Sequence, residues 1–167
     1  MDEQMCRLPN LVLSFQLTIK SDRDEVEGAA DRIMSLVQTL PCLQAGFDDL
    51  HRALLEALSN AIIHGNREDP AMTIDVCAGW DDQARVVIAV TDHGDGFDPA
   101  ALADPTSGEN RFAGHGRGVF LMRHLLDEVE FNLGGRQVVG STGVAFAGSS
   151  LYHQITYSCA VRQCCQH

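Results

Sequence analysis

The sequence has little positive charge. Among its 167 residues, 12 Lys and Arg are outnumbered by 23 Asp and Glu, which gives a formal net charge of −11. A broad surface for nucleic acid or for an anionic membrane needs positive charge, so we expect neither partner. No apolar run approaches the roughly 18 residues of a membrane-spanning helix. The first ten residues carry two acids and a proline and lack the long hydrophobic segment of a secretory signal. We therefore expect a cytoplasmic protein.

The sequence also lacks cysteine pairs at the spacing of a metal site. Three of its six cysteines stand apart among apolar or helical residues, where a buried free thiol is ordinary. These are Cys6, Cys42 and Cys77. The other three lie with a histidine in residues 159–167, but adjacent cysteines without a second pair are a weak signal for a metal.

Alternating and helical patterns predict one α+β domain over residues 1–146, followed by a tail of unknown role at 147–167. We expect a two-layer α/β sandwich, in which a mixed, mostly antiparallel sheet is covered on one face by about three helices. The expected strands are 11–19, 72–78, 85–91, 129–133 and 137–146. The expected helices are 24–40, 48–64 and 118–127. Residues 79–82 are expected to form a hairpin turn, and the polar segment 103–117 is long enough for a binding loop.

The segment E-A-L-S-N-A-I-I-H-G-N, residues 56–66, carries a polar stripe on a predicted helix. Glu56, Asn60 and His64 stand four residues apart and so share one helix face, and Gly65 is expected to end the helix. A carboxylate one turn from a carboxamide can take up a proton and ligate a hard cation at nearly the same point. A solvated surface helix shows the same kind of stripe, so the segment alone does not indicate a site.

The segment V-T-D-H-G-D-G-F-D-P, residues 90–99, leaves a predicted buried strand and enters a turn. Asp92 at the strand end could accept a hydrogen bond from an exocyclic amine. Gly94 and Gly96 would let a flat ring approach the backbone. On its own, an Asp- and Gly-rich segment is most often a simple turn.

The segment G-H-G-R-G-V-F-L-M, residues 114–122, has glycines at alternate positions before an apolar helix. Exposed amides in such a loop, together with the positive end of the helix, form a phosphate cradle. Arg117 adds a fixed positive charge with forked donors. The segment is neither the dinucleotide-binding fingerprint nor a Walker A loop. A flexible entry to the helix is the plainer interpretation of the segment alone.

In this order, the motifs E-x-x-x-N, D-x-G-x-G and G-x-G-x-G resemble the nucleotide-binding boxes of the histidine kinase-like (GHKL, Bergerat-fold) ATPase superfamily. Within it, the chain from about residue 10 to about residue 133 is similar to the anti-sigma-factor serine/threonine kinases. The resemblance implies ATP and Mg²⁺ as cofactors. Glu56 would be the general base for an attacking hydroxyl, Asn60 would bind Mg²⁺, and Asp92 would accept the adenine amine.

The resemblance also implies roles for the remaining motif residues. Gly94 and Gly96 would shape the adenine pocket. Three glycines would supply amides to the phosphates, namely Gly114, Gly116 and Gly118. Arg117 would contact the γ-phosphate, and His64 would either lie at the edge of the site or make a structural hydrogen bond. In the family, a threonine near the start of the last strand helps to hold the adenine; residues 135–146 match that strand poorly, and Thr142 is the nearest candidate.

The resemblance implies a serine/threonine kinase of a partner-switching system. It would transfer the ATP γ-phosphate to a Ser or Thr of a small anti-anti-sigma-type antagonist protein, would otherwise sequester a sigma factor or another regulatory protein, and could form a homodimer. Two alternatives stay open: a nucleotide-dependent binding module without phosphate transfer, and the ATP-binding fragment of a sensor histidine kinase. Against the second alternative, one strand and one helix are expected before Glu56, which leaves no helical hairpin with a phosphoacceptor histidine.

Overall fold

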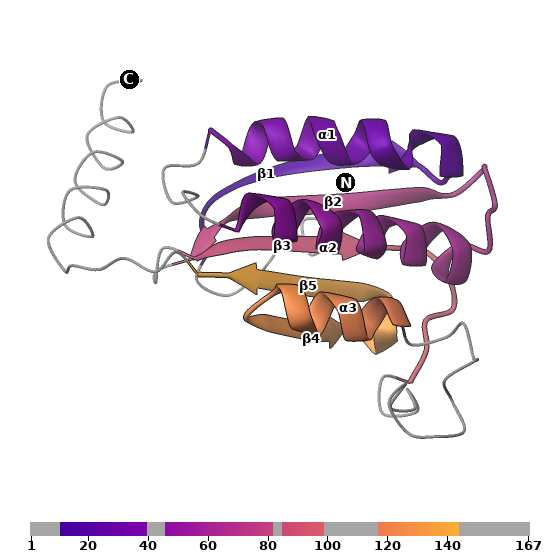
Figure 1. The fold of residues 1–167 in the computed structure, drawn as a ribbon. Coiled ribbons are helices and arrows are strands. Elements are labelled where there is room, and N and C mark those ends of the chain that lie inside the picture. Colours follow the sequence, from indigo (N-terminus) through magenta and orange to yellow (C-terminus); the bar gives the residue numbers. More distant parts are fainter. Residues whose placement is uncertain (1–10, 40–45, 82–84, 99–116, 144–167) are drawn as a thin grey trace, which may run out of the picture.

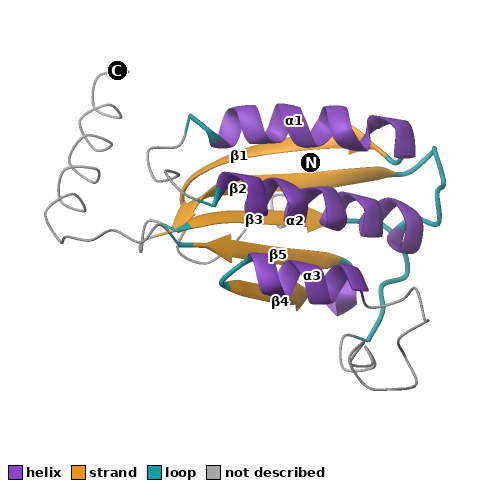
Figure 2. Cartoon of the chain, viewed as in Figure 1, coloured by secondary structure: helices purple, strands orange, loops and turns teal. Residues whose placement is uncertain are grey.

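The structure is a computed structural model that describes residues 11–39, 46–81, 85–98 and 117–143. These residues form an α+β fold around a five-stranded sheet with the strand order β1-β2-β3-β5-β4. The strands are β1 (Leu11–Lys20), β2 (Thr73–Asp81), β3 (Val86–Thr91), β4 (Glu128–Asn132) and β5 (Gln137–Thr142). The α-helices are α1 (Val26–Val37), α2 (Phe47–Asn60) and α3 (Arg117–Leu125). Figures 1 and 2 show these helices side by side on one face of the sheet.

The predicted two-layer fold is confirmed, with two refinements. Every strand pairing among the described residues is antiparallel, whereas the prediction allowed a mixed sheet. The expected hairpin turn at residues 79–82 is wrong for its first part, because β2 continues through it and Gly79 pairs with Val87. This part of β2 is buried on both faces, and a strand of that kind lacks the alternation that marks a half-buried one.

β5 lies inside the sheet and not at its closing edge. It pairs with β3 on one side and with β4 on the other, so β4 is the edge strand (Figure 1). The glycine-rich sequence that weakens the strand pattern has a packing reason. A Cβ at Gly140 would lie 2.5 Å from Cδ1 of Leu126, so the glycine leaves room for a buried side chain beneath α3.

The hydrophobic core lies between the helices and the covered face of the sheet. Both α1 and α2 bury one apolar face, as their helical periodicity predicts. Ile33 of α1 and Leu58 of α2 belong to one buried cluster with Ile74 and Val76 of β2. This packing holds the carboxyl end of α2 over the carboxyl end of β3, where the first two motifs lie.

Cys77 on β2 differs from its prediction. It is 1% exposed and disulfide-bonded, so the expectation of a free thiol there is wrong; burial does not distinguish the two states, because both are small and apolar. In the part of the chain that the structure describes, no helix has the length and apolar character needed to cross a membrane. The expected domain boundary at residue 146 and the tail at 147–167 lie outside the described residues.

Candidate functional site

The predicted polar stripe lies on α2, but the helix ends differently from the expectation. α-Helical geometry stops at Asn60, and Ala61–Gly65 form a π-helix. In a π-helix the hydrogen-bond partner is five positions away and not four. The turn that follows Asn60 is therefore wider than an α-helical turn, and it carries Gly65 toward the end of β3. π-Helical turns of this kind are frequent at functional sites.

The helical turns end at Gly65, as predicted, but the glycine is required there for close packing and not for its backbone conformation. It lacks the positive φ of a helix-ending glycine. A Cβ at Gly65 would lie 2.3 Å from Cγ of Asp92, and a Cβ at Gly94 would lie 1.9 Å from the carbonyl oxygen of Gly65. Both distances are far below van der Waals contact. The end of the first motif therefore packs directly on the second motif, and a side chain at either glycine would prevent this.

Asp92 follows β3 and holds its carboxylate at this contact. The residue is 7% exposed. Its backbone N–H donates to the carbonyl oxygen of Arg136 at 2.9 Å, and its Oδ1 accepts from the N–H of Gly94 at 2.9 Å. Burial raises the pKa of Asp92, and this effect exceeds the opposing effects of the Gly94 amide and the Arg136 charge. A carboxylate withdrawn from water in this way can gain a strong hydrogen bond from a ligand's donor group.

The second half of the same motif packs on the connection between β4 and β5, a 3₁₀ turn at Leu133–Gly135. The N–H of Phe97 donates to the carbonyl oxygen of Gly134 at 3.0 Å. Gly96 has a φ of +75°, and a Cβ there would lie 2.2 Å from the same oxygen. The ring of Phe97 meets the ring of Phe131 of β4 edge to face, with centroids 5.4 Å apart. The β4–β5 hairpin thus forms one wall of the site.

The third motif reaches the first at the start of α3. A Cβ at Gly118 would lie 1.8 Å from Oε1 of Glu56 and 2.8 Å from Nδ2 of Asn60. The first turn of α3, with its amides outside the helical hydrogen-bond ladder and its positive dipole end, therefore lies against the carboxylate and the carboxamide of the stripe. Gly114 and Gly116 lie outside the described residues, as does the side chain of Arg117.

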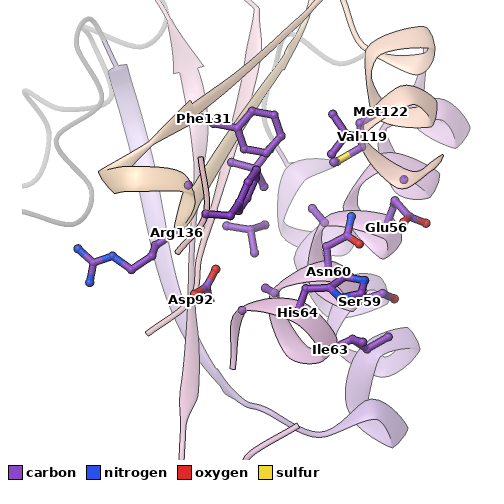
Figure 3. Close-up of a pocket in the computed structure, with 18 of the residues that line it drawn as sticks. Glu56, Ser59, Asn60, Ile63, His64, Asp92, Val119, Met122, Phe131 and Arg136 are labelled. Carbon is purple, nitrogen blue, oxygen red and sulfur yellow. The ribbon is translucent and has the colours of Figure 1, made fainter. Parts of the chain in front are cut away.

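A cavity of about 550 Å³ lies among the three motifs. Glu56 and Asn60 line it from α2, Asp92 lines it from the end of β3, and Gly118 lines it from α3. Figure 3 shows Asp92 on the sheet side of this cavity and Asn60 on the helix side. The lining is mostly apolar, and the volume lies within the range of about 300–1,000 Å³ that is typical of small-molecule pockets.

The sequence match agrees with this geometry. A family model of the histidine kinase-like ATPase domain matches residues 19–140. The chain belongs to this family. No curated protein sequence matches the chain. The matched range of the histidine kinase-like ATPase domain contains all three motifs and every cavity residue named above, and it supports an ATP-binding function for the cavity.

The residues of this histidine kinase-like ATPase domain fit an adenine nucleotide with Mg²⁺. The buried carboxylate of Asp92 suits the adenine amine, and the apolar walls suit its ring. Asn60 offers a hard oxygen ligand beside the first turn of α3. Among the described residues, no group of three or more His, Cys, Asp and Glu could hold a metal ion. A cation here would therefore need phosphate oxygens and water as its other ligands, which is the usual coordination of Mg²⁺ in nucleotide sites.

Sequence reasoning missed several residues of the cavity. Phe131 and Arg136 line it from the β4–β5 hairpin, and the motifs carry no information about which residues of that hairpin face the site. Phe97, which also lines the cavity, could have been predicted, since it lies inside the second motif. His64 lines the cavity, which agrees with the first of its two predicted roles; the second, a structural hydrogen bond, stays a prediction. The candidate Thr142 is wrong, because it pairs with Val86 at the end of β5 that is remote from Asp92.

Proposed function

We propose that the protein is an ATP-dependent serine/threonine protein kinase of a partner-switching system. The observation that carries the proposal is the position of Glu56. Glu56 lines the cavity one helical turn from Asn60, and its carboxylate lies against the first turn of α3. Asp92 lies on the opposite, sheet side (Figure 3). A nucleotide with its base at Asp92 would extend its phosphates toward Glu56.

Each part of the nucleotide has a group that suits it. Asp92 would accept a hydrogen bond from the adenine amine, and Phe97 would shield the ring from water. The positive end of α3 would favour the phosphates. Asn60 would ligate Mg²⁺, which neutralises phosphate charge and orients the γ-phosphoryl group.

The proposed reaction is a direct phosphoryl transfer. The hydroxyl oxygen of a substrate Ser or Thr attacks the γ-phosphorus, the bond from that phosphorus to the β–γ bridging oxygen breaks, and ADP leaves with the electron pair. Glu56 takes up the hydroxyl proton. A hydroxyl is a weak nucleophile at neutral pH and gains from a nearby base. Glu56 therefore favours a hydroxyl acceptor over the phosphoacceptor histidine of a sensor kinase.

The proposed partners follow from the resemblance of the three motifs. The substrate would be a small anti-anti-sigma-type antagonist protein in the cytoplasm. The sequestered target would be a sigma factor or another regulatory protein, and the kinase would act as a homodimer. In the competing function, the domain binds a nucleotide and a protein partner without transferring phosphate.

One experiment distinguishes the kinase from the binding module. The full chain is incubated with γ-labelled ATP, Mg²⁺ and the candidate antagonist encoded nearest to it, in parallel with the variants Glu56→Gln and Glu130→Gln. Glu130 is an exposed residue of β4, so its substitution removes the same charge outside the cavity.

We expect labelled antagonist with the unmodified chain and with Glu130→Gln. For Glu56→Gln we expect a rate lower by about 10²–10⁴-fold, the usual contribution of a general base, with ATP binding retained. Transfer at an unchanged rate in Glu56→Gln would remove Glu56 as the base. Saturable ATP binding without any transfer by the unmodified chain would assign the binding module instead.

A further inference from the structure

A hydrogen-bond network behind Asp92 fixes the backbone that carries its carboxylate. Asn66, which directly follows the π-helix, is 1% exposed. Its Nδ2 donates to the carbonyl oxygen of Thr73 at 2.9 Å, and its Oδ1 accepts from the N–H of His93 at 2.9 Å. Since the N–H of Asp92 itself donates to Arg136, the two successive peptide units on either side of Asp92 are each anchored to a different segment.

The side chain of His93 extends this network to the other face of the sheet. Its Nε2 lies 2.8 Å from Oδ2 of Asp75, and Thr18 Oγ1 donates to Oδ1 of the same carboxylate at 2.5 Å. Asp75 lies between Ile74 and Val76, which are in the helix-covered core. Because successive strand residues point to opposite faces, Asp75 lies on the face that the described helices leave uncovered. Asp92 thus faces the cavity while His93 is held on the opposite side of the sheet.

We propose that His93 is a positioning residue that, through Asp75, sets the orientation of Asp92 and so the preference of the cavity for adenine. His93 can act on Asp92 directly through the backbone, because the two residues are adjacent in the chain. Without the His93 side chain, the peptide unit between the two residues keeps its bond to Asn66, and through Asn66 its link to Thr73 of β2, but it loses the second attachment to β2, at Asp75. The less firmly held backbone then lets the Asp92 carboxylate, whose Oδ1 accepts from the N–H of Gly94, shift from its contact with Gly65.

The proposal rests on adenine-nucleotide binding in this cavity and not on phosphate transfer. It predicts a defect in base recognition that differs from a loss of stability. Inosine triphosphate tests this directly, because it carries a carbonyl oxygen where adenine carries its amine. A correctly oriented Asp92 accepts from the amine and repels the carbonyl oxygen, so the ratio of the two affinities reports the orientation of the carboxylate.

The experiment measures the dissociation constants of ATP and inosine triphosphate for the full chain with Mg²⁺. Four variants are compared: His93→Ala, His93→Gln, Asp92→Asn, and the double variant of His93→Ala with Asp92→Asn. His124→Ala is the matched control, since His124 is an exposed histidine of α3 whose Nδ1 lies 2.8 Å from the carbonyl oxygen of Phe120. Thermal unfolding of each variant shows that the protein measured is folded.

We expect His93→Ala to weaken ATP binding roughly fivefold, the effect of losing one ordinary hydrogen bond, while inosine triphosphate binding changes little. His93→Gln should restore most of the preference, because its side-chain amide can donate to Asp75. In the Asp92→Asn background, His93→Ala should have no further effect on the preference, since residues that act through one another are not additive.

An unchanged ATP preference in folded His93→Ala would overturn the proposal, as would equal weakening for both nucleotides. Additive effects in the double variant would also overturn it. If the unmodified chain bound neither nucleotide, the proposed function itself would fail, and this outcome is distinct from all of the others.

Discussion

Replacing Asp92 with Asn tests the site at the residue whose environment is best defined. Oδ1 of Asp92 already accepts from the N–H of Gly94 at 2.9 Å. In the Asn variant the carbonyl oxygen would keep this bond, so the Nδ2 group would face the cavity. A donor would then meet the donor amine of adenine. The variant therefore removes a charge-assisted hydrogen bond without changing the volume of the side chain.

The loss can be estimated from the energy of such a bond. A hydrogen bond to a charged group contributes about 1.5–3 kcal/mol, which corresponds to a dissociation constant for ATP that is roughly 10- to 150-fold higher. Calorimetric titration with ATP and Mg²⁺ measures this change. Asp95→Asn is the matched control, because Asp95 lies on the same loop, has an 81% exposed side chain and pairs with Arg67. We expect its effect to stay within about twofold, as for an exposed ion pair.

The same substitution should not destabilise the nucleotide-free protein at neutral pH. Burial raises the pKa of Asp92 above its ordinary value of 3.8, so the folded protein holds this proton more tightly than the unfolded chain does. The free energy of unfolding that Asp92 contributes is therefore complete below pH 3.8 and is lost as the pH rises through the raised pKa. Asp92→Asn, which carries no charge, should have its largest relative stability at neutral pH and lose that advantage in acid.

Thermal unfolding of both proteins across this pH range measures the difference. ATP affinity that is unchanged in Asp92→Asn would refute the proposed contact with adenine. A variant that is less stable than the unmodified chain at pH 7, with the deficit closing in acid, would refute the assignment of burial as the cause of the raised pKa.

Two further substitutions test how the motifs pack. In Gly118→Ala the new Cβ meets the flexible end of the Glu56 side chain at 1.8 Å. Because that end can move, we expect the melting temperature to stay close to that of the unmodified chain, while phosphate transfer falls at least tenfold. A large drop in melting temperature with normal transfer would contradict this. In Gly94→Ala the new Cβ meets the backbone oxygen of Gly65, which cannot move alone, and we expect denaturant titration to show a loss of about 3 kcal/mol or more. Gly28→Ala is the control for both variants, since nothing lies within 4 Å of its Cβ position. Alanine is also favoured over glycine in a helix by about 0.5–1 kcal/mol. A Gly94→Ala variant as stable as this control would refute the close packing of the first two motifs.

The layers of the fold follow from local patterns, which is why the sequence predicts them well. Each helix has a single apolar face, and most strands are bounded by turn residues. The place of β5 could not be predicted in this way. Its pairing with β4 through the turn at Gly134 and Gly135 is local and is expected from the sequence, but its pairing with β3 joins segments distant in the chain. Gly140, which weakens the strand pattern, is explained by its close approach to Leu126. The prediction ended β2 too early, because residues buried on both faces of a sheet do not alternate between apolar and polar.

The candidate site also has features that the sequence predicts and features that it does not. Glu56, Asn60 and Asp92 were predicted from motifs, and the structure brings them to one cavity. The role of Gly65 could not be predicted, because a helix terminator and a close-packing glycine look alike in the sequence. The π-helix between Asn60 and Asn66 could not be predicted either, since Ala61, Ile62 and His64 continue the apolar and polar faces of the preceding α-helix. The bond from Asn66 to the backbone of His93 depends on that turn.

The central claim is that three separated motifs form one site for Mg²⁺ and an adenine nucleotide. Calorimetric titration of the full chain with ATP, in the presence and absence of Mg²⁺, tests it most directly. We predict saturable binding of one nucleotide per chain that strengthens markedly when Mg²⁺ is present. Folded protein that takes up no ATP under either condition would contradict the account.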